Sequence, residues 1–435
     1  MKKLSKFQLV LLSVFGALAI SGVLIFALAV GGGNSSVLGP VTIWGTLDGR
    51  AFGAVLRAAA DEEPNLNQVT YVQKDPDTYE SDLTEALASG EGPDLFLLTQ
   101  DYALKTKGQV ALIPFSALPQ SQFEGTFVDV ASPFLSEVGV IGVPLIADPL
   151  VLYWNKDILS SAGYASPPQY WDQLFDIARS VSARNETGSI VQSALAFGEY
   201  KNIAHAKDIL ATLILQADGA ITQYDNSGKL RSALVLKSGG SASQATASAL
   251  RFYTEFADPS KDDYSWNRSL PEARQFFAAG DLALYVGYVS EREKIAQMNP
   301  NLSFGIAGLP QIRNASRTLD TSRVYALAAA RAGKNPSTAV TVAYLLTSAA
   351  NSQAFSTAFG LPSVRRDILG ATASGDVASR MVVTSHSWID PDPAQTDDIF
   401  RAMIENTTSG AMLLTEAISR ADQQLNHFLN QEQPQ

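Results

Sequence analysis

The chain contains no cysteine among its 435 residues. This absence excludes disulfides, thiolate metal sites, a cysteine nucleophile and a lipid attached to an N-terminal cysteine. Histidine is also scarce, because only His205, His386 and His427 occur and none shares a metal-ligand spacing with another. The sequence therefore predicts no metal site, and it fits an exported protein of a cell that does not rely on disulfides.

Positive charge is in deficit, with 32 Lys and Arg against 43 Asp and Glu and a net charge of −11. Such a balance argues against nucleic acid as a partner. Neither a GxSxG motif nor a phosphate-binding GxxxxGK[ST] motif is present. Acidic pairs such as Asp61 and Glu62 could suggest a glycosidase, but pairs of this kind are common on any acidic surface. We predict a protein that is not an enzyme and uses no cofactor.

Apolar sequence is concentrated at the N-terminus, where residues 7–30 contain only three side-chain-polar positions. As a helix this run would span ~36 Å, more than the ~30 Å core of a bilayer, and it exceeds the ~7–15 apolar residues of a cleavable signal. We predict a cytoplasmic basic segment at 1–6, a single-pass membrane anchor at 7–30 and a linker at 31–40. The alternative is secretion after cleavage near Ala29. Either way, the remainder lies outside the cell membrane.

Beyond residue 40 the chain alternates β-branched strands with amphipathic helices. The first three strands are predicted in "PVTIWGTLD", "NQVTYVQ" and "PDLFLLT". This order is typical of parallel sheets that are covered by helices on both faces. Ligands of such sheets bind outside the carboxyl ends of the strands. That rule nominates Trp44 and Thr46 after the first strand, and Thr99 and Gln100 after the third.

The segment "IGVPLIADPLVLYWNKDIL", residues 141–159, combines a buried apolar run with two prolines. Proline lacks the N–H group that a central strand needs for its ladder. We therefore expect two short extended pieces joined by a polar corner that presents Asp148. Corners of this kind lie at the surface, where functional residues gather.

Several stretches, in unbroken order from about residue 41 to 370, resemble one known family. They are Pro144 and Asp148 followed by "LYWNKDIL", then "SPPQYWDQLFDIARSV" at 166–181, "FFAAGDLALYVGYVSE" at 276–291, "FGIAGLPQ", and the alanine-rich block 323–369. This succession resembles the extracellular solute-binding proteins of ABC transporters (family 1), which include maltose- and other sugar-binding proteins. The chain differs in having Trp154 for a tyrosine and Leu284 for a methionine, which are apolar exchanges.

The resemblance implies an α/β fold of the periplasmic-binding-protein-like type II, with two α/β lobes, a hinge and an interlobe ligand cleft. We expect the first lobe at 41–147 and 303–350 and the second at 148–302 and 351–433, with 141–159 as the first crossover. The implied function is the capture of a small solute, with carbohydrate as the leading candidate, by lobe closure. Permease subunits of an ABC importer would be the partner of a monomeric protein.

A sugar site needs flat apolar rings together with side chains that bond hydroxyl groups. The resemblance implies Trp266, Tyr288 and Tyr325 as candidates, with Tyr200 in the polar loop 196–205 as a weaker one. Trp44 and Asp148 are candidates by position. Each also has a purely structural interpretation, as a core residue or, for Asp148, as a turn cap.

Two other functions remain open from the sequence. The acidic balance also suits a polyamine-type solute, for which Asp148 would be an ion-pair partner. An anchored binding or adhesion protein that is not coupled to transport is a further alternative. The residues do not identify the ligand.

Overall fold

The computed structural model of the chain describes residues 38–235, 241–372 and 376–432. The predicted basic segment (1–6), the predicted anchor (7–30) and most of the predicted linker lie outside these residues. Within the described ranges, no helix is both long and apolar enough to cross a membrane.

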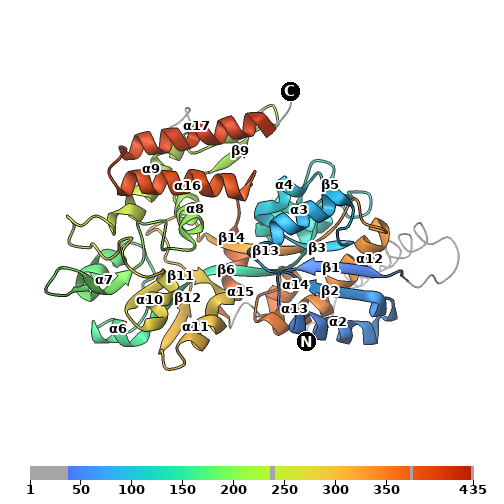
Figure 1. The fold of residues 1–435 in the computed structure, drawn as a ribbon, viewed down its shortest axis with the longest axis horizontal. Helices are drawn as coiled ribbons and strands as arrows, with labels where there is room; N and C mark the ends of the chain where they lie inside the picture. The colour runs from blue at the N-terminus through green and yellow to red at the C-terminus, as the bar shows by residue number, and fades with distance from the viewer. Residues whose placement is uncertain (1–37, 236–240, 373–375, 433–435) are drawn as a thin grey trace, which may run out of the picture.

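The N-terminal α/β units form as the alternation of the sequence predicts. Strands β1 (Val41–Gly45), β2 (Val69–Gln73) and β3 (Leu95–Thr99) are parallel, with β1 between the other two. Helix α2 (Gly49–Glu62) connects β1 to β2 through η1 (Pro64–Gln68), and α3 (Tyr79–Ser89) connects β2 to β3 (Figure 1). Because helices cover both faces of a parallel sheet, the apolar residues of β3 are buried on both sides.

The expected polar corner inside residues 141–159 is wrong, because β6 (Val143–Asn155) is one continuous strand of 13 residues. Its first part pairs with β13 (Asp320–Ala329), and its second part pairs with β11 (Leu282–Tyr288) and β12 (Phe304–Ala307). The strand thus runs through the whole molecule, and Asp148 is fully buried instead of exposed.

The two prolines of β6 lie where its ladder is interrupted. Pro144 faces Ala326, next to a register shift between Tyr325 and Ala326 of β13. Pro149 is the last residue of β6 that pairs with β13, before Leu150 begins the pairing with β11. Proline is tolerated at these positions because a bulge or a change of partner does not require its missing N–H.

These strands belong to one sheet of ten strands, with the order β2-β1-β3-β13-β6-β11-β8-β7; β4 with β5 and β9 with β10 form two separate pairs. Strands β8 (Ile190–Leu195) and β7 (Ala183–Arg184) end it, while β14 (Ser385–His386) pairs with β13. We call the part around β1–β3 the first half and the part around β8, β11 and β12 the second half. Figure 1 shows the two halves side by side, with β6 and β13 between them.

Helices and short strands complete each half. Those of the first half are η1 (Pro64–Gln68), η2 (Gln100–Tyr102), α4 (Ala103–Thr106), β4 (Ile113–Pro114), α5 (Gln120–Thr126), η3 (Asp129–Phe134), β5 (Gly139–Val140), α12 (Pro336–Leu346), α13 (Ala349–Phe359) and α14 (Arg366–Thr372). Those of the second half are α6 (Lys156–Ser161), α7 (Gln173–Val181), α8 (Ala206–Gln216), β9 (Thr222–Tyr224), β10 (Leu230–Ser232), α9 (Ser241–Glu255), α10 (Ala273–Ala279), η4 (Val289–Glu291), α11 (Arg292–Met298), α16 (Pro393–Thr408) and α17 (Leu414–Glu432). Helix α15 (Val377–Thr384) packs on β13 and β6.

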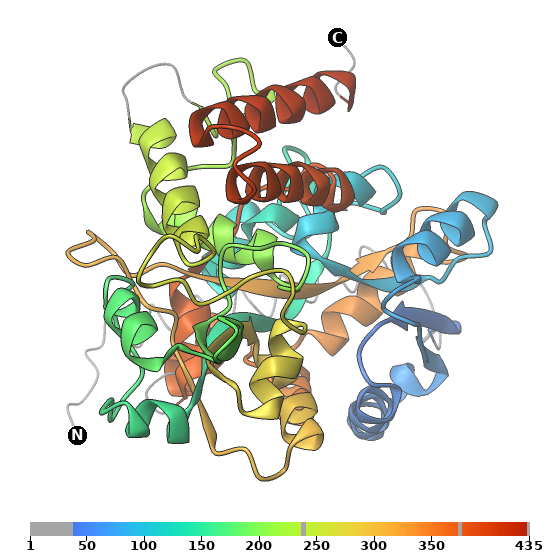
Figure 2. The same ribbon diagram turned by 60° about the vertical axis from the view of Figure 1, so that its left-hand side comes forward.

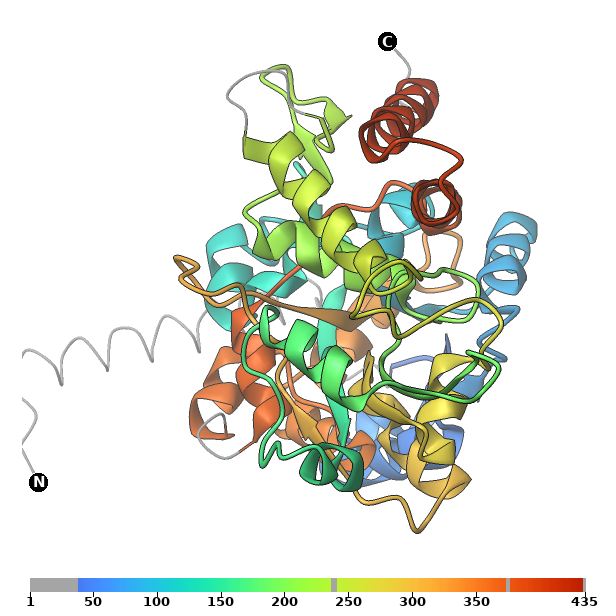
Figure 3. The same ribbon diagram turned by 90° about the vertical axis from the view of Figure 1, so that its left-hand side faces the viewer.

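Two contacts show how the segments near residues 303 and 350 pack. Helix α13 contacts α2, and Phe355 lies against Phe52 with ring centroids 4.8 Å apart, so α13 belongs to the first half. Strand β12 pairs with the far part of β6 and belongs to the second half. The C-terminal helices α16 and α17 pack on each other and on α9, at the same end of the molecule (Figures 2 and 3).

Candidate functional site

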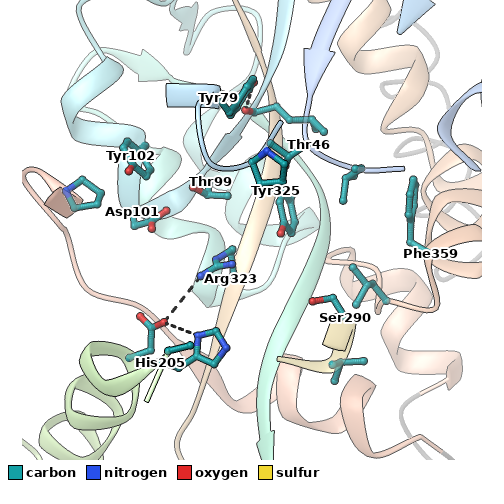
Figure 4. A pocket seen from close by; sticks show the side chains of 18 of the residues that line it. Thr46, Tyr79, Thr99, Asp101, Tyr102, His205, Ser290, Arg323, Tyr325 and Phe359 are labelled. Atoms are coloured by element: carbon teal, nitrogen blue, oxygen red, sulfur yellow. Dashed lines mark hydrogen bonds and ion pairs between the residues drawn. The ribbon is translucent and has the colours of Figure 1, made fainter. Parts of the chain in front are cut away.

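A cleft of about 1140 Å³ lies where the two halves meet. Its first wall comes from the segments that follow β1 and β3 and from the start of α3. Its second wall comes from the starts of α8, α11 and α16, and β13 forms its floor. Figure 4 shows the side chains of both walls pointing toward one another. The cleft thus lies at the edge of the sheet that the rule for carboxyl ends of parallel strands nominates.

Three of the residues nominated from the sequence line this cleft, namely Thr46, Thr99 and Tyr325. Thr46 follows β1, and Thr99 is the last residue of β3. Tyr325 lies on β13 directly opposite Thr99 in the antiparallel register, so the two side chains reach the cleft together.

Gln100 and Tyr288 are not among the lining residues; Gln100 bonds the β13 backbone on both sides of the lining residue Arg323, and Tyr288 bonds the lining residue Asp208. The Gln100 amide oxygen accepts the Val324 N–H at 2.6 Å, and its amide nitrogen donates to the Ser322 carbonyl at 3.4 Å. The Tyr288 hydroxyl donates to Asp208 Oδ2 at 3.0 Å. Both residues therefore have structural partners that the sequence does not reveal.

Asp148 lies behind the cleft and does not reach it. Its Oδ1 accepts the Ser290 N–H at 3.0 Å, and its Oδ2 has no hydrogen-bond partner within the described residues. Burial raises the pKa of this carboxyl to about 6, although the Ser290 hydrogen bonds and the charge of Arg323 act to lower it. The interpretation of Asp148 as a direct ligand contact is therefore not supported by its position.

The remaining three candidates lie away from the lining. Trp266 is fully buried and donates its indole N–H to Asn202 Oδ1 at 3.1 Å, so it is a core residue. Trp44 packs under Lys74, whose Nζ lies 3.6 Å from the ring centre. Tyr200 is half-buried, and its pKa is raised by burial and by Asp397.

The first wall contains charged and aromatic residues that sequence reasoning missed. Glu80 stands on α3, and Asp101 and Tyr102 stand on η2, all of them at the cleft. Burial and the neighbouring Asp101 raise the pKa of Glu80 to about 7. A signal for two of them exists in the sequence, because Asp101 and Tyr102 directly follow the nominated Thr99 and Gln100.

The second wall is organised around a polar cluster at the start of α8. His205 Nε2 lies 2.6 Å from Glu291 Oε1, and His205 Nδ1 lies 3.9 Å from Asp208. From the floor, the Arg323 guanidinium stands 4.2 Å from the centre of the Tyr288 ring and 4.0 Å from Asp208. These residues come from three distant segments, 205–208, 288–291 and β13, so no local pattern could have grouped all of them.

The cleft offers hydrogen-bond donors and acceptors together with flat rings. Tyr79, Tyr102, Tyr325 and Phe359 supply aromatic surface. In the parts of the chain that the structure describes, no group of three His, Asp or Glu side chains is placed to hold a metal ion. The arrangement suits the non-covalent binding of a small polar solute.

Thermal stability is expected to rise as the pH falls from 7.5 to 5.5. Burial raises the pKa of Asp148 and Asp320 to about 6, and that of Glu80 to about 7. A raised carboxyl pKa favours the folded state below that pKa, and this contribution is lost as the pH rises through it. Burial lowers the pKa of His386, which acts in the opposite direction but is a single group. Calorimetry should show a free energy of unfolding about 2 kcal/mol higher at pH 5.5 than at pH 7.5. An unchanged or lower melting temperature at pH 5.5 would contradict the raised pKa of these three carboxyls.

Comparison with known proteins places the chain in a family. The sequence profile of the bacterial extracellular solute-binding proteins matches residues 45–353. A protein of Brucella abortus (strain 2308), described as a candidate binding protein, is 22% identical over 293 residues, which is 67% of each chain. A cyclo/maltodextrin-binding protein complexed with maltotetraose superposes with a TM-score of 0.72 at 15% identity, covering 93% of this chain and 100% of its own.

A second solved structure has the same fold. It is an ABC transporter solute-binding protein of Thermotoga lettingae bound with α-D-tagatose, with a TM-score of 0.67 at 20% identity over 90% of this chain and 100% of its own. The fold and the family profile agree with the order of motifs found in the sequence. The chain belongs to the bacterial extracellular solute-binding proteins.

Proposed function

We propose that this protein captures a carbohydrate in the cleft between its halves and delivers it to an ABC importer. The observation that carries this proposal is the composition of the cleft, which has a volume of about 1140 Å³ and is lined by tyrosine rings and carboxylates. Similar folds in complex with maltotetraose and with α-D-tagatose add support.

Sugars combine apolar C–H faces with hydroxyl groups that both donate and accept. Tyr102 and Tyr325 would meet the C–H faces, while Asp101 and Asp208 would accept from hydroxyls. Arg323 would donate to sugar oxygens. These contacts come from both walls, so a ligand that bridges them favours the closed arrangement of the halves.

We propose that the two halves are the lobes of the binding protein and that the crossing strands β6 and β13 form the hinge between them. In this division α12–α14 belong to the first lobe, whereas β12, α16 and α17 belong to the second. The contacts described for α13 and β12 support it.

The N-terminal segment supports a proposal about location. Its length and the lysines before it favour an uncleaved anchor at 7–30 that keeps a monomeric binding protein at the outer face of the membrane, next to its permease partner. Secretion after cleavage near Ala29 is the alternative. A mass of the mature protein would decide between them, since an anchored chain retains residue 1 or 2.

Thermal melting with a ligand panel tests the function. The full chain in mild detergent would be heated with maltotetraose, α-D-tagatose, glucose or spermidine. A true ligand at about one hundred times its dissociation constant stabilises the protein by about 2.7 kcal/mol, a shift of a few degrees. A shift with a sugar supports the proposal. A shift with spermidine alone would favour the polyamine alternative, for which the carboxylates of the cleft provide a reason, and would overturn the carbohydrate assignment.

A matched pair of tyrosine variants locates the site. Tyr102→Ala removes a ring from the cleft wall, and we expect it to weaken sugar binding by about tenfold or more, since a buried aromatic contact contributes on the order of 1 to 2 kcal/mol. Tyr224→Ala is the control, because Tyr224 is an exposed tyrosine of β9 outside the cleft. Titration calorimetry with the stabilising sugar measures both. Equal affinities of the two variants would place the site elsewhere.

A further inference from the structure

The backbone next to Arg323 is bonded to the first half of the molecule through Gln100, while Thr321, two residues earlier on β13, lies 2.6 Å (Oγ1 to Oγ1) from Thr212 of α8 in the second half. Arg323 lies on β13 opposite Asp148. The next residue of β6, Pro149, is the last that pairs with β13, and Leu150 already pairs with β11. Gln100 holds the chain on both sides of it, by accepting the Val324 N–H and donating to the Ser322 carbonyl. The main chain on both sides of Arg323 is thus held directly by η2, which belongs to the first wall.

The side chain of Arg323 reaches in the other direction. Its guanidinium lies over the ring of Tyr288, which belongs to β11, and pairs with Asp208, which belongs to α8. Tyr288 and Asp208 are joined to each other by a hydrogen bond of 3.0 Å. Arg323 thus spans from the backbone of the first half to a linked pair of side chains in the second, as Figure 4 shows in part.

The geometry leaves Arg323 and Asp208 able to bind a ligand. The 4.0 Å separation from Asp208 exceeds a direct N–H···O bond, and a contact with a ring face uses no N–H group, so neither contact consumes the donors of Arg323 at hydrogen-bonding distance. Both side chains line the cleft and are about one-third exposed. Tyr325 and Asp101 also act electrostatically on Arg323, Asp148 faces it on β6, and His205 lies 3.9 Å from Asp208.

We propose that Arg323 is the positioning residue that couples the two walls of the cleft. In the free chain it holds Asp208 and Tyr288 toward the first half. With a sugar bound, its donors and the Asp208 carboxylate address adjacent hydroxyl groups of one ring. The second statement rests on the proposed carbohydrate function, whereas the first does not need any ligand.

Spin labels measure the coupling directly, because a chain without cysteine accepts labels only where cysteines are introduced. Ser89→Cys on α3 and Ser160→Cys on α6 place one label on an exposed site of each half. Pulsed electron-paramagnetic-resonance distances would be recorded on the full chain in detergent without ligand. Arg323→Gln is expected to raise the ratio of open to closed molecules by about tenfold. Arg323→Lys, which keeps the charge but not the planar guanidinium group, should raise it by less.

Arg313 provides a matched control. Its guanidinium also stacks on a tyrosine, 4.2 Å from the ring centre of Tyr170, and it pairs with Asp172 at 2.7 Å, but all three residues lie in the second half. Arg313→Gln should therefore leave the label distances unchanged. Thermal melting would establish that both variants remain folded.

The outcomes separate this proposal from the carbohydrate assignment. A distance distribution of Arg323→Gln equal to that of the parent, or an equal change in Arg313→Gln, would overturn the coupling role. If the distances change as expected while no sugar of the panel binds to the parent, the coupling stands and the carbohydrate function fails. If a sugar binds, Arg323→Gln should also weaken it, and Arg323→Lys should restore part of the loss.

Discussion

Replacement of Glu291 by alanine is expected to lower the free energy of unfolding by about 3 to 5 kcal/mol. In the parent protein, Glu291 Oε1 is hydrogen-bonded to His205 Nε2 at 2.6 Å and accepts the Tyr288 N–H at 2.9 Å. Its Oε2 receives the Tyr285 hydroxyl at 2.7 Å and Arg274 at 3.1 Å. Removal of the carboxylate leaves these buried or half-buried donors without their acceptor, and each unpaired group has a desolvation cost.

Denaturant unfolding at pH 7 measures this loss, with Glu85→Gln on the exposed face of α3 as the control. We expect the control to change stability by less than about 0.5 kcal/mol. A loss below about 1 kcal/mol for Glu291→Ala would show that the donors find water or other partners, and would contradict the role given to this cluster.

The contacts of Glu291 also predict how stability depends on pH. Burial alone would raise the pKa of Glu291, but the hydrogen bond and charge of His205, with further bonds from Tyr285 and Tyr288, lower it to about 2. A lowered carboxyl pKa contributes stability that is complete above the ordinary value and is lost as the pH falls through 2. The stability difference between the parent and Glu291→Gln should therefore stay constant from pH 7 to about 5 and shrink below about pH 4.

Replacement of Gly198 by alanine is the second change for which we expect a large effect, a loss of about 3 kcal/mol or more. Gly198 has φ +93°, which side chains rarely adopt, and an added Cβ would lie 2.5 Å from Ala257 Cβ and 3.0 Å from Ala257 N. The Thr408 hydroxyl also holds the Gly198 carbonyl at 2.6 Å. Since α9 and α16 fix the loop from both sides, the clash cannot be relieved by a small shift.

Gly188→Ala separates the two causes of that loss. Gly188 has a similar φ of +81°, but nothing lies within 4 Å of its Cβ position. Its replacement should cost about 1 kcal/mol, the price of the left-handed conformation alone. Chemical denaturation of both variants gives the contribution of the contact with Ala257 by difference. Equal losses would mean that the backbone conformation, and not the packing, requires Gly198.

Local sequence patterns predicted the elements of the first half well. The strands and helices from residue 41 to 99 appear in the predicted order, because the apolar period of each segment fits only one kind of buried surface. The same alternation predicted the edge of the sheet at which the cleft lies, and Thr46 and Thr99 line that cleft. Prolines 144 and 149 were misinterpreted, because the sequence shows a missing N–H but does not show that the ladder has a bulge or a new partner at that point.

The sequence by itself determined the α/β class, the family and the edge of the sheet where the cleft forms, because these depend on periodicity and on an order of motifs along the chain. Only the tertiary structure decided which side chains meet there. Gln100 and Tyr288 hold neighbouring groups by hydrogen bonds, and Trp266 is buried in the core. Arg323 lies next to Asp208, which is 115 residues away in the sequence. Contacts of this kind depend on the crossing of β6 and β13 between the halves, and their partners are too distant along the chain for any local pattern to record.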